Sequence, residues 1–151
     1  MEEALAFREE LGLPGMKVLQ FGFGKNLINS EHTLHNHENE NYAVYTGTHD
    51  NDTIIGWYKS LEKEDKKRLK AYFGHKVTKR NIHFVMNRLA LSSNANIAIL
   101  QAQDLIGLDS DARLNTPGTI EGNWVWRIKP GQLNEDVRQW LTRNTVIFRR
   151  S

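Results

Sequence analysis

Short apolar segments that alternate with amphipathic segments constrain the fold of this chain more than any other feature of its sequence. Three brief runs of apolar, aromatic or β-branched residues cover 17–21, 42–46 and 97–100, each bounded by Gly or by polar residues. Runs this short favour buried strands over helices. Strands that are covered on both faces lose the alternation of apolar and polar residues, which is typical of parallel βα units. The pattern therefore predicts an α/β sheet or barrel.

Helices are predicted around these strands from apolar residues at helical spacing and from stop signals. Gly12 and Pro14 end a first helix, Gly74 ends another, and Asn134 can cap a last one. Long polar loops are expected at 24–41 and 107–126. The predicted helices cover 2–11, 60–73, 78–91 and a final segment from 135 onward.

Composition bounds the class of protein. A chain of 151 residues with 39% hydrophobic residues is long enough for one core, so a single domain over 1–151 is expected. The net charge is only +2 with interleaved signs, which predicts neither a nucleic-acid partner nor a membrane surface. The chain has no Cys, no N-terminal apolar signal segment and no run of 18 apolar residues, which together indicate a cytoplasmic protein.

Polar clusters follow the second and third predicted strands, where α/β folds bind ligands. His49, Asp50 and Asn51 come directly after the second strand, in a setting that can hold a carboxylate rigidly. Asp50 is the candidate catalytic residue, although an Asp in this context also suits a turn or a helix cap. Asp52 is the better capping candidate, because it stands nearer the next helical segment. Gln101 is among the polar residues that follow the third strand.

Three other motifs have two interpretations each. His32, His35 and His37 could converge on zinc, but their spacing matches no metal motif, and the surrounding Asn and Glu are typical of a solvated loop. The segment 21–25 imitates a phosphate loop without the required glycine spacing or the Ser or Thr after Lys. Arg113 and Asn115 could contact a ligand or satisfy loop carbonyls. We therefore predict no metal and no cofactor.

Three parts of the chain resemble the C-terminal portion of the amylomaltase family, the 4-α-glucanotransferases that disproportionate maltooligosaccharides. Their order and spacing agree with that family, and the resemblance covers nearly the whole chain. The matching segments are LPGMKVLQF at 13–21, then YTGTHDNDT at 45–53 with Gly56-Trp57, and finally QDLIGL at 103–108, ARLNTPGT at 112–119 and GNWVWR at 122–127.

The resemblance implies a (β/α)₈ barrel, with the three strands as its sixth, seventh and eighth. It also implies retaining transfer between α-1,4-glucans, in which one carboxylate is the nucleophile and a second is the acid/base. A third carboxylate binds donor-sugar hydroxyls and stabilises the transition state, and Asp50 matches it. His49 matches the neighbouring imidazole that contacts the same sugar, Asn115 lies in a loop that borders the substrate groove, and Asn51 is a further expected substrate contact.

The nucleophile and acid/base of the family lie upstream, on strands that this chain does not carry. A complete barrel takes roughly 250 residues, so we expect the C-terminal part of a longer enzyme, inactive alone. Its expected partners are maltooligosaccharides and the missing N-terminal part of the barrel, since open sheet edges invite pairing. The alternative is a non-catalytic carbohydrate-binding module. In such a module the stacking platform would be formed by Trp57, Trp124 and Trp126. No acid/base role is assigned to the glutamates of the predicted first helix, because they belong to a surface helix: Glu2, Glu3, Glu9 and Glu10.

Overall fold

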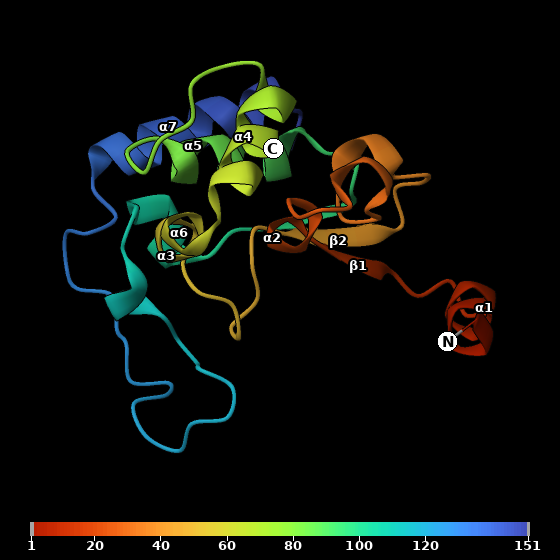
Figure 1. Ribbon diagram of the computed structural model, residues 1–151, viewed down its shortest axis with the longest axis horizontal. Helices are drawn as coiled ribbons and strands as arrows, with labels where there is room; N and C mark the ends of the chain where they lie inside the picture. The colour runs from red at the N-terminus through yellow and green to blue at the C-terminus, as the bar shows by residue number, and fades with distance from the viewer. Residues whose placement is uncertain (1, 151) are drawn as a thin grey trace.

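A three-stranded parallel sheet organises the chain in the computed structural model, which describes residues 2–150 (Figure 1). The strand order is β1-β2-β3, and the α/β class predicted from the sequence is confirmed. The elements in chain order are α1 (Glu2–Glu10), β1 (Gly15–Val18), α2 (Leu19–Gly22), η1 (Leu27–Asn29), η2 (Leu34–Asn36), β2 (Tyr42–Tyr45), α3 (Ile54–Ser60), α4 (Lys63–Phe73), α5 (Ile82–Ser92), β3 (Ile97–Ile99), α6 (Ala102–Ile106), η3 (Ser110–Ala112) and α7 (Glu135–Ile147).

The first strand lies earlier than the sequence predicted. Apolar residues suggested a strand over 17–21, but β1 ends at Val18 and a helical turn, α2, begins at Leu19. The register explains the difference, because β1 pairs with β2 only from Gly15↔Tyr42 to Val18↔Tyr45, where β2 itself ends. A short apolar run has no periodicity that separates a strand from one turn of buried helix. The residues that follow Val18 therefore lie at the carboxyl ends of the strands.

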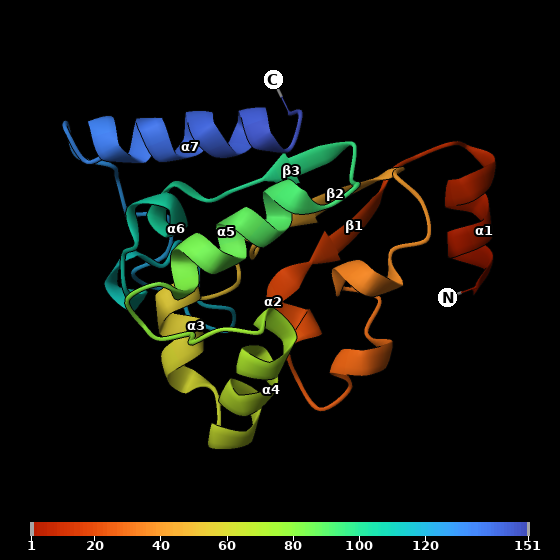
Figure 2. The same ribbon diagram turned by 90° about the horizontal axis from the view of Figure 1, so that it is seen from above.

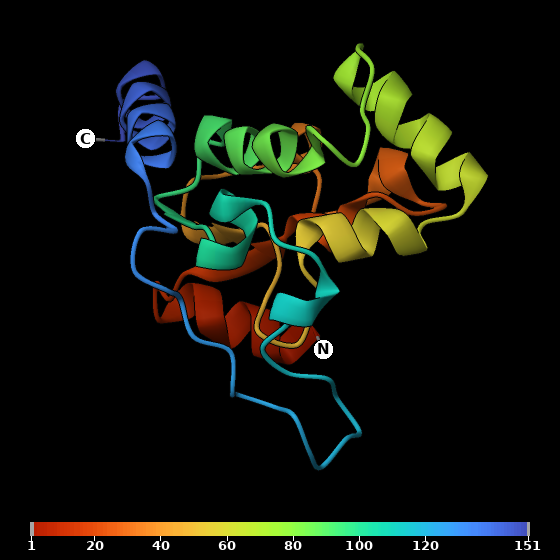
Figure 3. The ribbon, with the colours of Figure 1, turned by 90° about the vertical axis from the view of Figure 1, so that its left-hand side faces the viewer.

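One face of the sheet is covered by helices. Figures 2 and 3 show α5 lying along the strands, with α4 and α7 on the same side. Val44 on β2, Ile82 and Met86 on α5, and Leu69 on α4 are fully buried and belong to one hydrophobic cluster. Burial of these aliphatic side chains supplies the main force that holds this layer together.

The other face of the sheet is largely open. Met16, Ile97 and Ile99 are 55%, 48% and 40% exposed. Apolar composition shows that a face is suited to burial, but it does not show that the same chain supplies a covering element. Exposed apolar faces are commonly found at interaction surfaces.

Helix α1 lies beyond the end of β1, away from the other helices (Figures 1 and 2). The predicted first helix is confirmed, and its apolar side chains Leu5 and Phe7 are 46% and 61% exposed. Glu3, Glu9 and Glu10 are exposed on it, as expected for a surface helix.

The predicted helix over 60–73 corresponds to α4, which begins at Lys63, and a separate helix, α3, precedes it and ends at Ser60. Leu61 between them is extended, with φ −61° and ψ 142°, which interrupts the helical backbone. The end of α4 at Gly74, with φ 68°, agrees with the prediction, because glycine adopts this left-handed conformation without a side-chain clash.

The later helices follow the sequence signals more closely. Helix α5 begins at Ile82 and not at Thr78, because Asn81 Oδ1 accepts a hydrogen bond from the backbone N–H of Thr78, at 2.7 Å, in a preceding turn. The predicted cap of α7 is confirmed, since Asn134 Oδ1 accepts from the N–H of Val137 at 3.0 Å. Among the described residues, no helix is both long enough and apolar enough to cross a bilayer.

Candidate active site

The loop Gly47–Thr53 follows β2 and carries the two residues singled out from the sequence, His49 and Asp50. Inside it, Asn51 Oδ1 accepts hydrogen bonds from the backbone N–H and the hydroxyl of Thr48, both at 2.8 Å. The N–H of Asn51 donates in return to the Thr48 carbonyl at 3.1 Å. This closed turn places His49 and Asp50 at its tip, with side chains 55% and 49% exposed.

Two glutamines from the neighbouring strand ends fix this loop. Gln20, on α2, donates to the carbonyl of Asp52 at 2.9 Å. Gln101, which follows β3, donates to the carbonyls of Gly47 and Thr48 at 2.7 and 2.8 Å. A Cβ at Gly47 would lie 2.7 Å from Gln20 Nε2, so a side chain at this position would displace the Gln20 amide. The loop is therefore fastened from both sides of β2. The sequence placed Gln101 in the polar cluster but gave no signal for Gln20.

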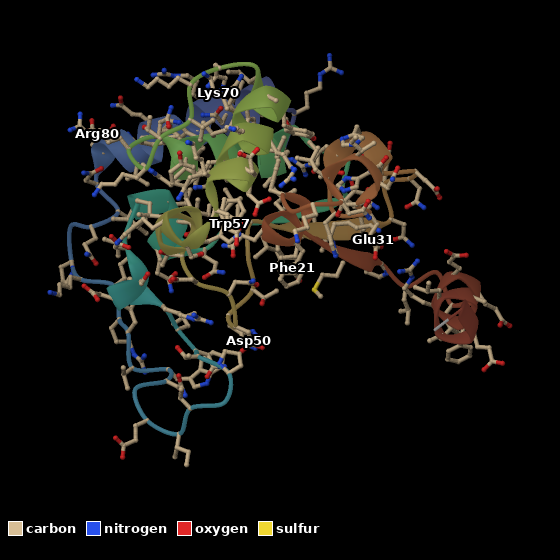
Figure 4. All side chains as sticks on the ribbon, in the orientation of Figure 1. Phe21, Glu31, Asp50, Trp57, Lys70 and Arg80 are labelled. Atoms are coloured by element: carbon tan, nitrogen blue, oxygen red, sulfur yellow. The ribbon has the colours of Figure 1, made fainter. Side chains whose placement is uncertain are left out.

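Asp50 meets residues from the loop that follows η3 (Figure 4). Its Oδ1 accepts a hydrogen bond from Asn115 Nδ2 at 2.5 Å and lies 3.4 Å from His49 Nε2. Arg113 donates to the backbone carbonyls of Asp50 and Asn115 at 2.6 and 2.8 Å. Of the predicted site residues, His49, Asp50 and Asn115 thus come together, and Asn51 closes the turn that carries the first two. Arg113 satisfies loop carbonyls, which was one of its two interpretations.

Asp52 does not cap the next helix, so that interpretation is wrong. The N-cap of α3 is Thr53, whose hydroxyl accepts from the N–H of Gly56 at 3.1 Å. Thr53 directly precedes the first helical residue in an extended conformation, which brings its hydroxyl within reach of the free N–H groups. Asp52 instead accepts from the Thr53 N–H at 2.8 Å and from the Ser110 hydroxyl at 2.8 Å, so it ties the loop to η3.

A pocket of about 760 Å³ opens beside Asp50 at the strand ends. Side chains from β1, α2, β2 and β3 give it an apolar floor, and the loop Gly47–Thr53 gives it a polar rim. Such a combination suits a sugar, whose ring faces are apolar and whose hydroxyls need hydrogen-bond partners. The lining includes Met16, Phe21, Tyr45 and Ile99 on the floor and His49 and Asp50 on the rim.

The tryptophans do not share one surface role. Trp124 lies against His49, with ring centroids 5.1 Å apart and planes tilted by 38°, and it is 53% exposed. Its φ of 62° is unusual for a residue with a side chain. Trp57 packs edge-on against the buried ring of Phe23, at 6.2 Å, and adjoins the hydrophobic core. Trp57 therefore contributes to packing, whereas Trp124 borders the candidate site.

The three clustered histidines each have a partner within the fold. His32 Nδ1 accepts from the N–H of Val18 at 3.2 Å, and His35 Nε2 lies 3.0 Å from the Ile28 carbonyl. His37 Nδ1 lies 2.6 Å from the hydroxyl of Tyr42, and burial lowers the pKa of this imidazole to about 4. Within residues 2–150 no three His, Cys, Asp or Glu side chains are grouped so as to hold a metal ion. These imidazoles brace the loop Gly24–Asn41.

The fold and the site together define an α/β protein with a candidate ligand site at the carboxyl ends of parallel strands, built from a carboxylate, an imidazole and an amide. Comparison with known families specifies the class further, because the sequence model of the 4-alpha-glucanotransferase family matches residues 1–134. The chain belongs to the 4-alpha-glucanotransferase family, and the resemblance expected from the sequence is confirmed.

Individual relatives agree with this assignment. The 4-alpha-glucanotransferase of Synechocystis sp. is 44% identical over 148 residues, which cover 98% of this chain and 29% of that protein. The chloroplastic/amyloplastic 4-alpha-glucanotransferase of Solanum tuberosum is 46% identical over 127 residues, covering 84% and 22%. The structure of amylomaltase from Streptococcus agalactiae in complex with acarbose superimposes with a TM-score of 0.92 at 34% identity, covering 99% of this chain and 30% of that one. The chain thus spans less than a third of the curated relatives' length.

Proposed function

We propose that this chain is the C-terminal part of the (β/α)₈ barrel of a 4-α-glucanotransferase, with β1, β2 and β3 as the sixth, seventh and eighth strands. The enzyme would move segments of α-1,4-glucan between maltooligosaccharides with retention of configuration. One observation carries the proposal: in a chain of this family, the carboxylate of Asp50 is held by Asn115 at 2.5 Å beside a pocket at the strand ends.

Asp50 is the proposed transition-state stabiliser. An ionised carboxylate accepts hydrogen bonds from sugar hydroxyls, and its negative charge favours the positive charge that develops on an oxocarbenium-like ring. Asn115 and Arg113 hold the carboxylate and its backbone, so little reorganisation is needed when the charge develops. Preorganisation of this kind is what distinguishes a catalytic group from an exposed turn residue.

His49, Asn51 and Asn115 are the proposed substrate-binding residues. His49 lies beside Asp50 Oδ1 and against the indole of Trp124, so its ring is oriented from two sides. Asn51 uses its Oδ1 to close the turn, and its amide nitrogen is the group that we assign to the sugar. Asn115 can share its amide between Asp50 and a hydroxyl of the donor sugar.

The reaction also needs a nucleophile and an acid/base. We assign both to the portion of the relatives that this chain does not match, since Glu3, Glu9 and Glu10 are exposed on α1, away from the pocket. The open face of the sheet outside the pocket, where Ile97 is exposed, is the surface on which we expect that portion to pack. Acarbose, named in the complex of the similar Streptococcus agalactiae amylomaltase, makes maltooligosaccharides the first substrates to test.

A hybrid enzyme tests the proposal. In this hybrid, the chain replaces the segment of the Synechocystis enzyme that it matches over 148 residues. The assay measures glucose released from maltotriose by disproportionation. We expect transfer activity in the hybrid and a fall in kcat/KM of about 10³-fold on Asp50→Asn, the size of effect seen when a preorganised transition-state contact is removed. Asp136→Asn, at an exposed carboxylate on α7, is the matched control and should change nothing.

Two results would contradict the proposal: a folded hybrid with no transfer activity, or full activity after Asp50→Asn. The alternative function, a carbohydrate-binding module, has one observation in its favour, the exposed indole of Trp124. Titrating maltoheptaose into the chain by itself, while following Trp fluorescence, separates the two. Tight, saturable binding that survives Asp50→Asn and is lost with Trp124→Ala would favour the module.

A further inference from the structure

Asp104 lies at the point where both ends of the loop Gly47–Thr53 meet helix α6. Its side chain is buried, with the residue only 1% exposed. Its Oδ1 accepts from the backbone N–H of Ile54 at 2.7 Å, and its Oδ2 accepts from the hydroxyl of Thr46 at 3.2 Å. Thr46 directly precedes the loop and Ile54 directly follows it, so one carboxylate joins the two ends of the segment that carries His49 and Asp50.

We propose that Asp104 is a positioning residue, which sets the place of the His49–Asp50 pair by holding the loop at both ends. Its effect on glucan transfer rests on the proposed function, whereas its effect on the loop does not. Asp104 touches neither His49 nor Asp50 through any hydrogen bond of the structure, so its influence passes through the backbone. A short loop with fixed ends has few conformations, and its tip is placed correspondingly well.

The support behind Asp104 is itself firm. Its N–H donates to the Gln101 carbonyl at 3.1 Å. Its own carbonyl accepts from Asn87 Nδ2 at 3.1 Å, and the same amide nitrogen donates to the His83 carbonyl at 2.8 Å. Asn87 and His83 lie on α5, which packs on the covered face of the sheet. Through Asp104, the loop is thereby anchored to α5 and to the hydrophobic core.

The electrostatics of Asp104 give this contact a pH dependence. Burial raises the pKa of this carboxyl to about 6; the hydrogen bonds from Ile54 and Thr46 oppose the rise, and the like charge of Asp52 adds to it. On the α5 side, the titratable group is His83, whose ring lies against Gly107 at the end of α6 and whose pKa is lowered by burial. The ionised carboxylate accepts both hydrogen bonds. Protonation removes one acceptor site, so the loop is held less firmly in acid.

Amide hydrogen exchange tests the positioning role without any assay of activity. Exchange is followed at Ile54, Thr48 and Asn51, on the full chain and on the hybrid enzyme. Asp104→Ala should speed exchange at all three amides by at least about tenfold, and Asp104→Asn should restore most of the protection, because Asn keeps an oxygen for the Ile54 N–H. Asp136→Ala is the control and should leave these amides unchanged. Equal exchange rates in Asp104→Ala and the parent would overturn the proposal.

A milder variant keeps the test decisive if Asp104→Ala does not fold. Thr46→Val removes one of the two hydrogen bonds with little change of shape. We expect it to increase the rate of amide exchange in the loop, but by a smaller factor than Asp104→Ala. No change at Thr48 or Asn51 in Thr46→Val would also overturn the proposal.

Glucan transfer by the hybrid enzyme provides the second readout. Misplacement of a catalytic group by about 1 Å costs about 100-fold in rate, so we expect Asp104→Ala to lower kcat by 10- to 100-fold with a smaller change in KM. Asp104→Asn should recover most of kcat and flatten the pH profile of kcat around pH 6. A normal kcat and an unchanged pH profile would contradict positioning. If Asp50→Asn leaves transfer intact while Asp104→Ala still loosens the loop, the proposed function fails and the positioning role stands.

Discussion

Asn115 donates a hydrogen bond of 2.5 Å to Oδ1 of Asp50 from a position 65 residues further along the sequence. The contact joins the loop after β2 to the loop after η3, and Arg113 reinforces it by donating to the carbonyl of each partner. The two loops thereby act as one unit around the candidate carboxylate. The first prediction concerns the value of this contact.

Asn115→Ala should lower kcat/KM of the hybrid enzyme for maltotriose by about 10- to 100-fold. A hydrogen bond to a charged group contributes about 1.5–3 kcal/mol, and its loss leaves Asp50 free to turn away from the sugar. The control is Asn26→Ala, because Asn26 is exposed and makes no side-chain cap in its turn. In the double variant with Asp50→Asn the two losses should not add, since both act on one carboxylate. Full additivity would show that the residues work independently.

Arg113→Lys should lower kcat about tenfold although the positive charge is kept. The planar guanidinium reaches two carbonyls, on Asp50 and on Asn115, whereas an ammonium is a single point of donation and cannot reproduce that geometry. Steady-state transfer kinetics of the hybrid enzyme measure the effect. Arg138→Lys, on the exposed side of α7, is the matched control. An unchanged kcat would mean that the loops hold each other without this residue.

Local signals were sufficient for much of the fold. Gly74 and Asn134 mark helix ends through their own backbone and side-chain chemistry, and both predictions are confirmed. Distant relationships had no such signal. The pairing of Asp50 with Asn115 depends on where two loops converge, and the strand register that brings them together is a property of the whole sheet. The short helix α6 has too few residues to show a helical period, so Asp104 could not be placed under the loop.

Asp104 should make the stability of the chain depend on pH. Its pKa is raised from 3.8 to about 6 in the fold, so the folded state holds the proton more tightly than the unfolded state does. Below about pH 4 the Asp104 carboxyl is protonated in both the folded and the unfolded state, so its burial carries no cost of ionisation. As the pH rises from 4 through 6, the unfolded state ionises first and stability falls. At about 1.4 kcal/mol per pH unit, the loss is on the order of 3 kcal/mol.

Urea unfolding followed by circular dichroism at pH 4 and pH 7 measures this effect. The free energy of unfolding of Asp104→Asn, relative to the parent, should increase by on the order of 3 kcal/mol between the two values, because the variant cannot ionise. Asp136→Asn, at an exposed residue on α7, is the matched control. If the difference in free energy of unfolding between Asp104→Asn and the parent stays constant across this range, ionisation of Asp104 does not destabilise the fold. The same carboxylate would then fasten the loop without destabilising the core.

Gly56→Ala should destabilise the chain and disturb the site together. A Cβ at Gly56 would lie 2.3 Å from Asp52 Oδ2 and 2.3 Å from the Ser110 hydroxyl, which are themselves hydrogen-bonded to each other at 2.8 Å. Overpacking of this kind typically costs about 1–3 kcal/mol. The matched control is Gly24→Ala, where nothing lies within 4 Å of the new methyl group and the backbone is not left-handed.

Relief of the clash at Gly56 would move Asp52, whose carbonyl receives the Gln20 hydrogen bond that anchors the loop. We therefore expect Gly56→Ala to lower kcat of the hybrid enzyme even at temperatures where the variant is fully folded. Urea unfolding gives the stability, and maltotriose transfer gives the rate. A variant that is destabilised as expected but transfers glucan at the parent's rate would show that the Asp52 anchor does not reach Asp50. The loop would then depend on Gln101, Arg113 and Asp104 alone.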